Sequence, residues 1–137
     1  MIWKEKYRIG VELIDRQHRE LFERVNGFIK VVRSGQSMEE KLEEIEKTFS
    51  FMGEYVVVHF ESEEAVQRKY EFPEYERHKK IHDDFRNDVK KFKSKFENDK
   101  YNEELVQEFS GRLLTWLINH VTGEDQKISE YVKRGEK

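Results

Sequence analysis

Apolar side chains recur at spacings of three and four residues along four successive segments of this chain, and this pattern constrains the fold more than any other feature. The spacing matches the α-helical repeat of about 3.6 residues, so each segment is expected to be a helix with one buried face. The longest stripe runs without interruption from Leu42 to Tyr70. Four helices of similar length with short turns between them favour an all-α fold, an antiparallel up-down-up-down four-helix bundle.

Capping and turn residues predict where the helices begin and end. The first helix is expected to start after Asp15, which would cap it, and to end at Ser-Gly, residues 34–35. The second is expected to start at Ser37, because Glu40 three residues later completes a capping-box pattern. Pro73 should end the second helix and open the third, since proline disfavours a helical residue before it and suits a first helical turn.

The two ends of the chain lack this clean period. Between Trp3 and Ile14 the apolar residues follow no helical spacing, so an extended N-terminal arm packed across the helices is expected. Gly123 should loosen or end the fourth helix. A short C-terminal helix through Ile128 and Val132 should follow.

Composition narrows the possible functions. Residues 1–137 contain no linker or repeat and are expected to form a single domain. The 26 basic and 29 acidic side chains are interleaved, which argues against nucleic-acid binding. Cysteine is absent, which excludes disulfides, thiolate catalysis and iron–sulfur clusters. With no signal-peptide pattern and no stretch suited to spanning a membrane, we expect a cytoplasmic protein without a membrane partner. A monomer is expected, with an oligomer left open.

All five histidines and two carboxylates form one series along the chain. Its members are His18, His59, Glu63, His78, His82, His120 and Asp125. Helical phasing places the five histidines and Glu63 on inward faces. A buried ionised glutamate is costly unless it pairs with a cation or binds a metal. His78 and His82 are four residues apart, so both imidazoles project from one helix face and can bind a single ion.

The series contains more ligands than one ion needs, so it predicts a two-metal centre. Imidazole and carboxylate donors suit iron, zinc, copper or manganese. Two carboxylates can each bridge two ions, and five imidazoles leave one ion a ligand short, with an open position for a small molecule. Asp125 follows His120 by five residues, which separates their side chains on an ideal helix. The helix is therefore expected to loosen at Gly123, so that Asp125 turns back to the site.

Four stretches of the chain resemble the hemerythrin family, most closely its single-domain bacterial members, the bacteriohemerythrins. They are GVELIDRQH ending at His18, HFESEE beginning at His59, FPEYERHKKIH ending at His82, and WLINHVTGED ending at Asp125. These stretches cover nearly the whole chain in the order of the family.

The resemblance implies two iron ions with a bridging oxo or hydroxo group, and a function in reversible dioxygen binding. One iron would be held by His78, His82 and His120. The other would be held by His18 and His59. The two irons would be bridged by Glu63 and Asp125. The iron with two histidines would have the open position for dioxygen, or for a small anion such as azide.

Apolar residues match family positions beside this open position. They are Phe60, Trp116, Leu117 and Val121. As an oxygen pocket they would exclude water and anions; simple core packing explains them equally well. Gln67 departs from the family, whose members often carry methionine or leucine there, and is expected to flank the apolar stripe.

The sequence is compatible with three functions. The first is an oxygen carrier for storage, delivery or scavenging, which is not an enzyme. The second is a di-iron redox enzyme acting on peroxide, oxygen or nitric oxide, although the Glu-x-x-His pairs of ferritin-like oxidases are absent. The third is a sensor of oxygen or iron.

Overall fold

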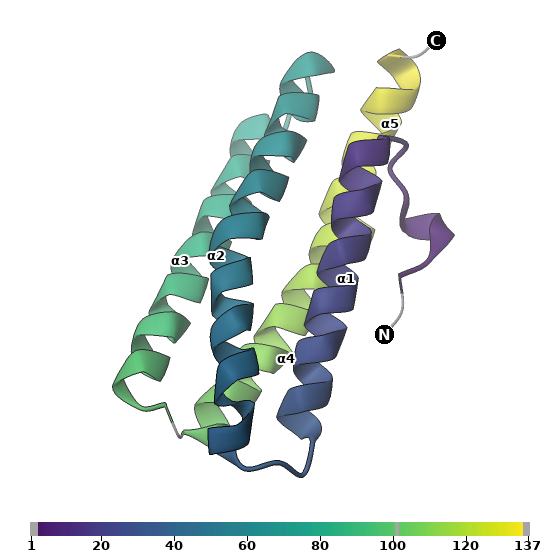
Figure 1. Cartoon of the computed structure of the whole chain (residues 1–137). Helices are drawn as coiled ribbons and strands as arrows, with labels where there is room; N and C mark the ends of the chain where they lie inside the picture. Colours follow the sequence, from purple (N-terminus) through teal and green to yellow (C-terminus); the bar gives the residue numbers. More distant parts are fainter. Residues whose placement is uncertain (1–2, 101, 136–137) are drawn as a thin grey trace.

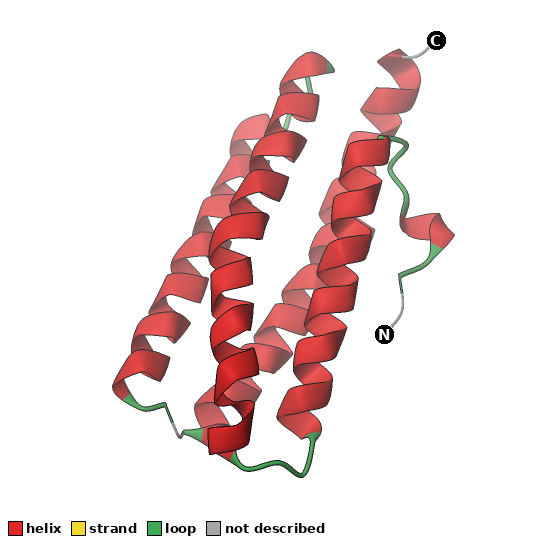
Figure 2. Cartoon of the chain, viewed as in Figure 1, coloured by secondary structure: helices red, strands yellow, loops and turns green. Residues whose placement is uncertain are grey.

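The computed structural model describes residues 3–100 and 102–135, and every regular element within them is a helix (Figure 2). The bundle consists of four long helices: α1 (Glu12–Arg33), α2 (Met38–Lys69), α3 (Tyr75–Asn98) and α4 (Glu103–Asn119). A π-helical turn (His120–Glu124) joins α4 to α5 (Asp125–Gly135). The chain reverses direction between successive long helices, which confirms the antiparallel up-down-up-down bundle and the short C-terminal helix (Figure 1).

The predicted cap of α2 is confirmed. The Glu40 N–H donates to Ser37 Oγ at 3.2 Å, and the Ser37 hydroxyl donates to Glu40 Oε1 at 3.1 Å. The first turn of α4 has a similar cap, because Leu105 N–H donates to the side-chain oxygen of Asn102 at 3.0 Å. Such caps satisfy backbone N–H groups that have no partner within the helix.

The predicted start of α1 is wrong: the helix begins at Glu12, and Asp15 lies in its first turn. Asp15 instead accepts backbone hydrogen bonds from the preceding arm. Its Oδ1 accepts from Ile9 N–H at 2.8 Å and its Oδ2 from Gly10 N–H at 3.3 Å. Gly10 has a φ of 94°, in the left-handed region that favours glycine. Asp15 thus holds the turn that leads into α1, rather than capping a helix that follows it.

The N-terminal arm runs beside α1 as expected and contains one short 3-10 turn, Glu5–Tyr7 (Figure 1). The Tyr7 ring stacks on Phe22 of α1 with centroids 5.7 Å apart. At the other side, Gln126 of α5 donates from Nε2 to the Tyr7 carbonyl oxygen at 2.8 Å. The arm therefore connects the first and last helices.

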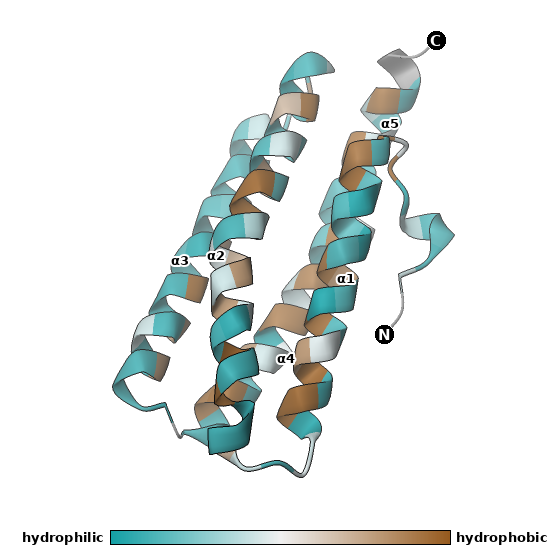
Figure 3. Ribbon diagram, viewed as in Figure 1, coloured by the Kyte–Doolittle hydropathy of each residue, from teal (hydrophilic) through white to brown (hydrophobic). Residues whose placement is uncertain are grey.

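Among the residues that the structure describes, buried apolar side chains form two clusters. The smaller cluster comprises Ile9, Ile14, Phe72, Ile128 and Val132. The larger cluster, called the main core below, is rich in phenylalanine and includes Leu21 and Phe85. Figure 3 shows the alternation of apolar and hydrophilic residues along the helices that creates these faces.

The histidines lie between the two clusters. On α1, His18 stands between Ile14 of the smaller cluster and Leu21 of the main core. The same sequence order recurs at α3, where His78 and His82 lie between Phe72 of the smaller cluster and Phe85 of the main core. Apolar side chains therefore cover this polar layer on both sides along the bundle axis. Within the described residues, no helix combines the length and hydropathy that a membrane span requires.

Candidate metal centre

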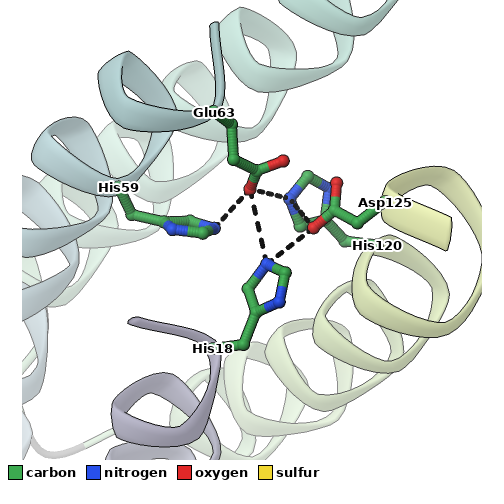
Figure 4. A group of neighbouring side chains, drawn as sticks. All are labelled: His18, His59, Glu63, His120 and Asp125. Carbon is green, nitrogen blue, oxygen red and sulfur yellow. Dashed lines mark hydrogen bonds and ion pairs between the residues drawn. The ribbon is translucent and has the colours of Figure 1, made fainter. Parts of the chain in front are cut away.

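The structure brings all seven predicted ligands together in this layer. They are His18 of α1, His59 and Glu63 of α2, His78 and His82 of α3, His120 of the π turn, and Asp125 of α5. Each is at most 2% exposed. Figure 4 shows five of them converging from different helices. Groups distant in the sequence therefore meet because each helix turns its apolar stripe toward the same interior.

The Glu63 carboxylate lies at the centre of the group (Figure 4). Its Oε1 contacts His59 Nε2 and lies 2.9 Å from His120 Nε2 and 3.5 Å from His18 Nε2. Its Oε2 lies 4.0 Å from His78 Nε2. Glu63 therefore faces histidines from three other segments of the bundle as well as one from its own helix.

Asp125 occupies a comparable position from the opposite side. Its Oδ2 lies 2.7 Å from His18 Nε2 and 3.0 Å from His120 Nε2. Its Oδ1 lies 3.2 Å from His78 Nε2. Each carboxylate thus contacts histidines of both sets that the family resemblance divides between two irons.

The π turn explains how Asp125 reaches the site. The Asp125 N–H donates to the His120 carbonyl oxygen, five residues earlier. A backbone wound in this way brings residues five apart to one face, which an α-helix does not. The expected loosening at Gly123 is confirmed, because Gly123 lies within the π turn. Neither the backbone nor the surroundings require a glycine there, since Gly123 has no positive φ and a Cβ would meet no atom within 4 Å.

A bidentate ion pair joins the π turn to α3. Arg77 Nη2 lies 2.8 Å from Glu124 Oε2, and Nη1 donates to Oε1 at 3.4 Å. Glu124 immediately precedes Asp125. The pair is a tertiary contact that restrains the turn, although exposed pairs of this kind contribute at most about 1 kcal/mol.

Two imidazoles are held by oxygen atoms behind the site. His59 donates from Nδ1 to Gln17 Oε1 at 2.8 Å, and His82 Nδ1 lies 3.4 Å from Glu64 Oε2. An oxygen acceptor keeps the proton on Nδ1 and leaves Nε2 directed at the site. Sequence reasoning missed Gln17 and Glu64. Their only signal was adjacency to His18 and Glu63, which does not reveal a partner on another helix.

Gln67 also belongs to this outer layer. Its Nε2 contacts Nδ1 of His78, and the side chain is completely buried. The expectation that it flanks the apolar stripe is therefore wrong. The signal was present in the sequence, because Gln67 follows Glu63 by four residues, as Glu63 follows His59.

Burial and the two carboxylates shape the pKa values of the site. Burial opposes protonation of His18, but its hydrogen bonds to Asp125 and Glu63 outweigh that effect and raise its pKa to about 10. Burial lowers the pKa of His82 to about 2 and also lowers that of His59. Burial alone would raise the pKa of Glu63, but the charges of His59 and His120 hold it well below its usual value. Imidazoles whose pKa values are shifted in opposite directions thus lie side by side.

The donor set fits metal ions. The Nε2 atom of His82 is buried without a hydrogen-bond partner, and the Nε2 atoms of His18, His59 and His78 contact only the carboxylate oxygens of Glu63 and Asp125. Unpaired buried polar atoms cost about 1–3 kcal/mol each, a cost that cations would remove. Imidazole and carboxylate together suit iron and similar first-row metals.

The donors form two overlapping groups whose ligand atoms lie within 4.8 Å of one another. One group is His18, His59, Glu63, His120 and Asp125. The other is Glu63, His78, His82 and His120. The overlap suits two adjacent ions that share ligands. His120 belongs to both groups, so the geometry alone does not divide the imidazoles three against two.

The predicted pocket residues adjoin this layer in two ways. The Phe60 ring stacks on His82 at 3.8 Å between centroids, and Trp116 stacks on His120 at 4.6 Å. Leu117 and Val121 are completely buried within the main core. The two aromatic rings therefore lie against imidazoles predicted for the three-histidine iron, although Phe60 is also 5.9 Å from His59 of the other set.

Comparisons with known proteins agree with this arrangement. The family model described as the Hemerythrin HHE cation binding domain matches residues 9–132. A bacteriohemerythrin of Stenotrophomonas maltophilia is 28% identical over 97% of this chain and 82% of its own length. A bacteriohemerythrin of Clostridium acetobutylicum is 28% identical over 92% of this chain and 96% of its own. A myohemerythrin of Theromyzon tessulatum is 28% identical over 91% of this chain and 88% of its own. With this match and this buried metal-binding cluster, the chain belongs to the hemerythrin family.

Proposed function

We propose that this protein binds dioxygen reversibly at a pair of non-haem iron ions bridged by an oxo or hydroxo group. The observation that carries the proposal is the placement of two buried carboxylates, Glu63 and Asp125, each in contact with histidines of both expected sets. Iron held in this way supplies the electrons for dioxygen binding. In this proposal one iron is bound by His78, His82 and His120. The other is bound by His18 and His59.

The side chains around the layer perform three tasks. Glu63 and Asp125 supply negative charge that neutralises cations in a buried place. Outer acceptors such as Gln17 orient an imidazole so that its Nε2 faces inward. The apolar clusters on both sides exclude water, which protects a reduced site from side reactions. Phe60, Trp116, Leu117 and Val121 are proposed to form the nearest part of this barrier.

The histidines support a carrier more than an enzyme. All five are assigned as ligands, so no histidine is left to transfer protons to a substrate. We therefore propose that the protein is not an enzyme. Steady turnover of peroxide, oxygen or nitric oxide with a reductant would contradict this and favour a redox enzyme. Oxygen-dependent binding of a partner protein would favour a sensor.

Metal analysis combined with spectroscopy tests the proposal. The protein reduced under anaerobic conditions should contain two irons per chain and should gain a visible absorption band when oxygen is admitted. The band should disappear when oxygen is removed, over repeated cycles. A matched pair of variants distinguishes the two iron sites. His59→Ala should impair oxygen binding, whereas His82→Ala should weaken retention of the iron bound by three histidines. Irreversible bleaching, or equal and negligible effects of both variants, would refute the assignment.

The remaining sequence predictions stay predictions. They are a single domain over residues 1–137, a monomeric state, a cytoplasmic location, azide as a competing anion, and the lack of nucleic-acid or membrane partners. Gel filtration, cell fractionation and azide titration of the iron-loaded protein test them.

A further inference from the structure

Gln67 is a completely buried amide at a position turned toward the metal layer. It lies on α2, one helical turn beyond Glu63. Burying an amide without a hydrogen bond costs about 1–3 kcal/mol in proteins. An apolar side chain would fill this position without that cost, so the amide requires a partner to be tolerated.

That partner is His78. Gln67 Nε2 contacts His78 Nδ1, while Gln67 Oε1 has no hydrogen-bond partner. The other ring nitrogen of His78, Nε2, faces the site and lies 3.2 Å from Asp125 Oδ1. The imidazole is therefore held between the carboxylates on one side and the Gln67 amide on the other.

The hydrogen bonds of His59 and His82 show which kind of atom is suited to the Nδ1 of an imidazole in this layer. Gln17 presents Oε1 to His59 Nδ1, and its own Nε2 donates to Ser62 Oγ at 3.1 Å, which sets the orientation of that amide. Glu64 presents Oε2 to the corresponding nitrogen of His82. Both supports are oxygen acceptors. A half-turn of the Gln67 amide about its Cγ–Cδ bond would exchange oxygen and nitrogen in nearly the same space.

We propose that Gln67 is a positioning residue for His78, whose Nδ1–H donates to the Gln67 carboxamide oxygen and whose Nε2 is thereby left free to bind a metal ion. This inference rests on the proposed metal site. A cation at Nε2 requires the ring proton to reside on Nδ1, so the orphaned oxygen of Gln67 gains a donor. Unlike Glu64, Gln67 is neutral, so it orients its imidazole without adding negative charge.

Zinc-loaded protein tests the inference, because zinc is diamagnetic and the ring nitrogens can be observed by nitrogen-15 NMR. In the unaltered protein, His78 should bind zinc through Nε2 and show an Nδ1–H that exchanges slowly with water. Gln67→Met fills the space but offers only a weak thioether acceptor in place of the carboxamide oxygen. It should accelerate that exchange and weaken zinc affinity by about tenfold or more. Gln67→Glu retains an oxygen acceptor and should preserve the slow exchange.

Gln17→Met provides the matched control, because it removes the support of His59 and should leave the His78 signal unchanged. The inference is overturned if Gln67→Met leaves both His78 exchange and zinc affinity unaltered, or if Gln67→Glu behaves as Gln67→Met does. Circular dichroism checks that each variant folds; if Gln67→Met does not, Gln67→Glu decides through retention or loss of the slowly exchanging proton.

A failure of the proposed function is distinguishable, since no readout depends on iron or oxygen. Should zinc not bind, the same spectra are recorded on metal-free protein in buffer alkaline enough to neutralise His78. A single Nδ1–H tautomer that becomes a mixture in Gln67→Met would then support the positioning role. A mixture, or a single Nε2–H tautomer, in the unaltered protein would overturn it.

Discussion

Replacing Gly123 by alanine should stabilise this protein, whereas the same change at Gly10 should destabilise it. At both positions a Cβ would meet no atom within 4 Å, so space does not distinguish them. The backbone does: Gly10 has a φ of 94°, whereas Gly123 is not among the residues with positive φ. Alanine at a compatible position stabilises by about 0.4–1 kcal/mol, because it restricts the unfolded chain. In a left-handed conformation it costs about 1–2 kcal/mol.

These free energies correspond to measurable shifts in melting temperature. An unfolding entropy of about 2.1 cal/mol/K per residue implies about 3.5 °C per kcal/mol for the 137-residue chain. Gly123→Ala should therefore raise Tm by about 1.4–3.5 °C, and Gly10→Ala should lower it by about 3.5–7 °C. Thermal unfolding of the metal-free protein, followed by circular dichroism, measures both. Gly111→Ala on α4, also facing open space, is the matched control and should stabilise as Gly123→Ala does.

The opposite signs make the reasoning easy to refute. If Gly123→Ala lowered Tm and weakened metal binding, the π turn would depend on glycine after all. If Gly10→Ala were neutral, the turn held by Asp15 would relax at little cost, and the positive φ would not constrain the residue at that position.

Three further predictions concern the arm, the site and the smaller cluster. Asp15→Asn should lower the midpoint of urea unfolding by the equivalent of about 1–3 kcal/mol, because a charged acceptor of two backbone N–H groups is lost; an unchanged midpoint would contradict this role. Burial opposes protonation of His18, but Asp125 and Glu63 raise its pKa to about 10, so its contribution to stability is complete below pH 6.5 and is lost as the pH rises toward 10. Zinc must displace that proton, so zinc affinity should increase with pH in this window. Calorimetry in buffers of different ionisation enthalpy should detect the released proton. Zinc binding without proton release would contradict the raised pKa of His18. Ile128→Ala should cost about 2–5 kcal/mol in thermal unfolding, since Ile128 is completely buried, and a loss below about 1 kcal/mol would show that the cluster collapses to fill the space.

Helical phase was predictable because it is local. The three-four spacing that places Val56 on the inner face of α2 also places His59 and Glu63 there, and all three are completely buried. The caps at Ser37 and the turn at Pro73 likewise involve neighbours within a few residues. Such interactions depend on short stretches of backbone, so a single sequence contains the information that predicts them.

The wrong sequence predictions concern side chains whose hydrogen-bond partners lie on other segments of the fold. Asp15 has the composition of a helix cap, yet its hydrogen bonds go to the arm before it. Gln67 was expected at the edge of the stripe, yet it contacts His78 on another helix.

By itself, the sequence determined the four helices and the inward placement of the five histidines and Glu63, because each follows from backbone periodicity. Only the tertiary structure decided how these donors meet. The π turn directs Asp125 toward histidines of α1 and α3. Packing between α2 and α3 likewise brings the Gln67 amide to the back of an imidazole. These contacts join residues whose separation in the sequence carries no periodic signal, so they arise only when the helices pack.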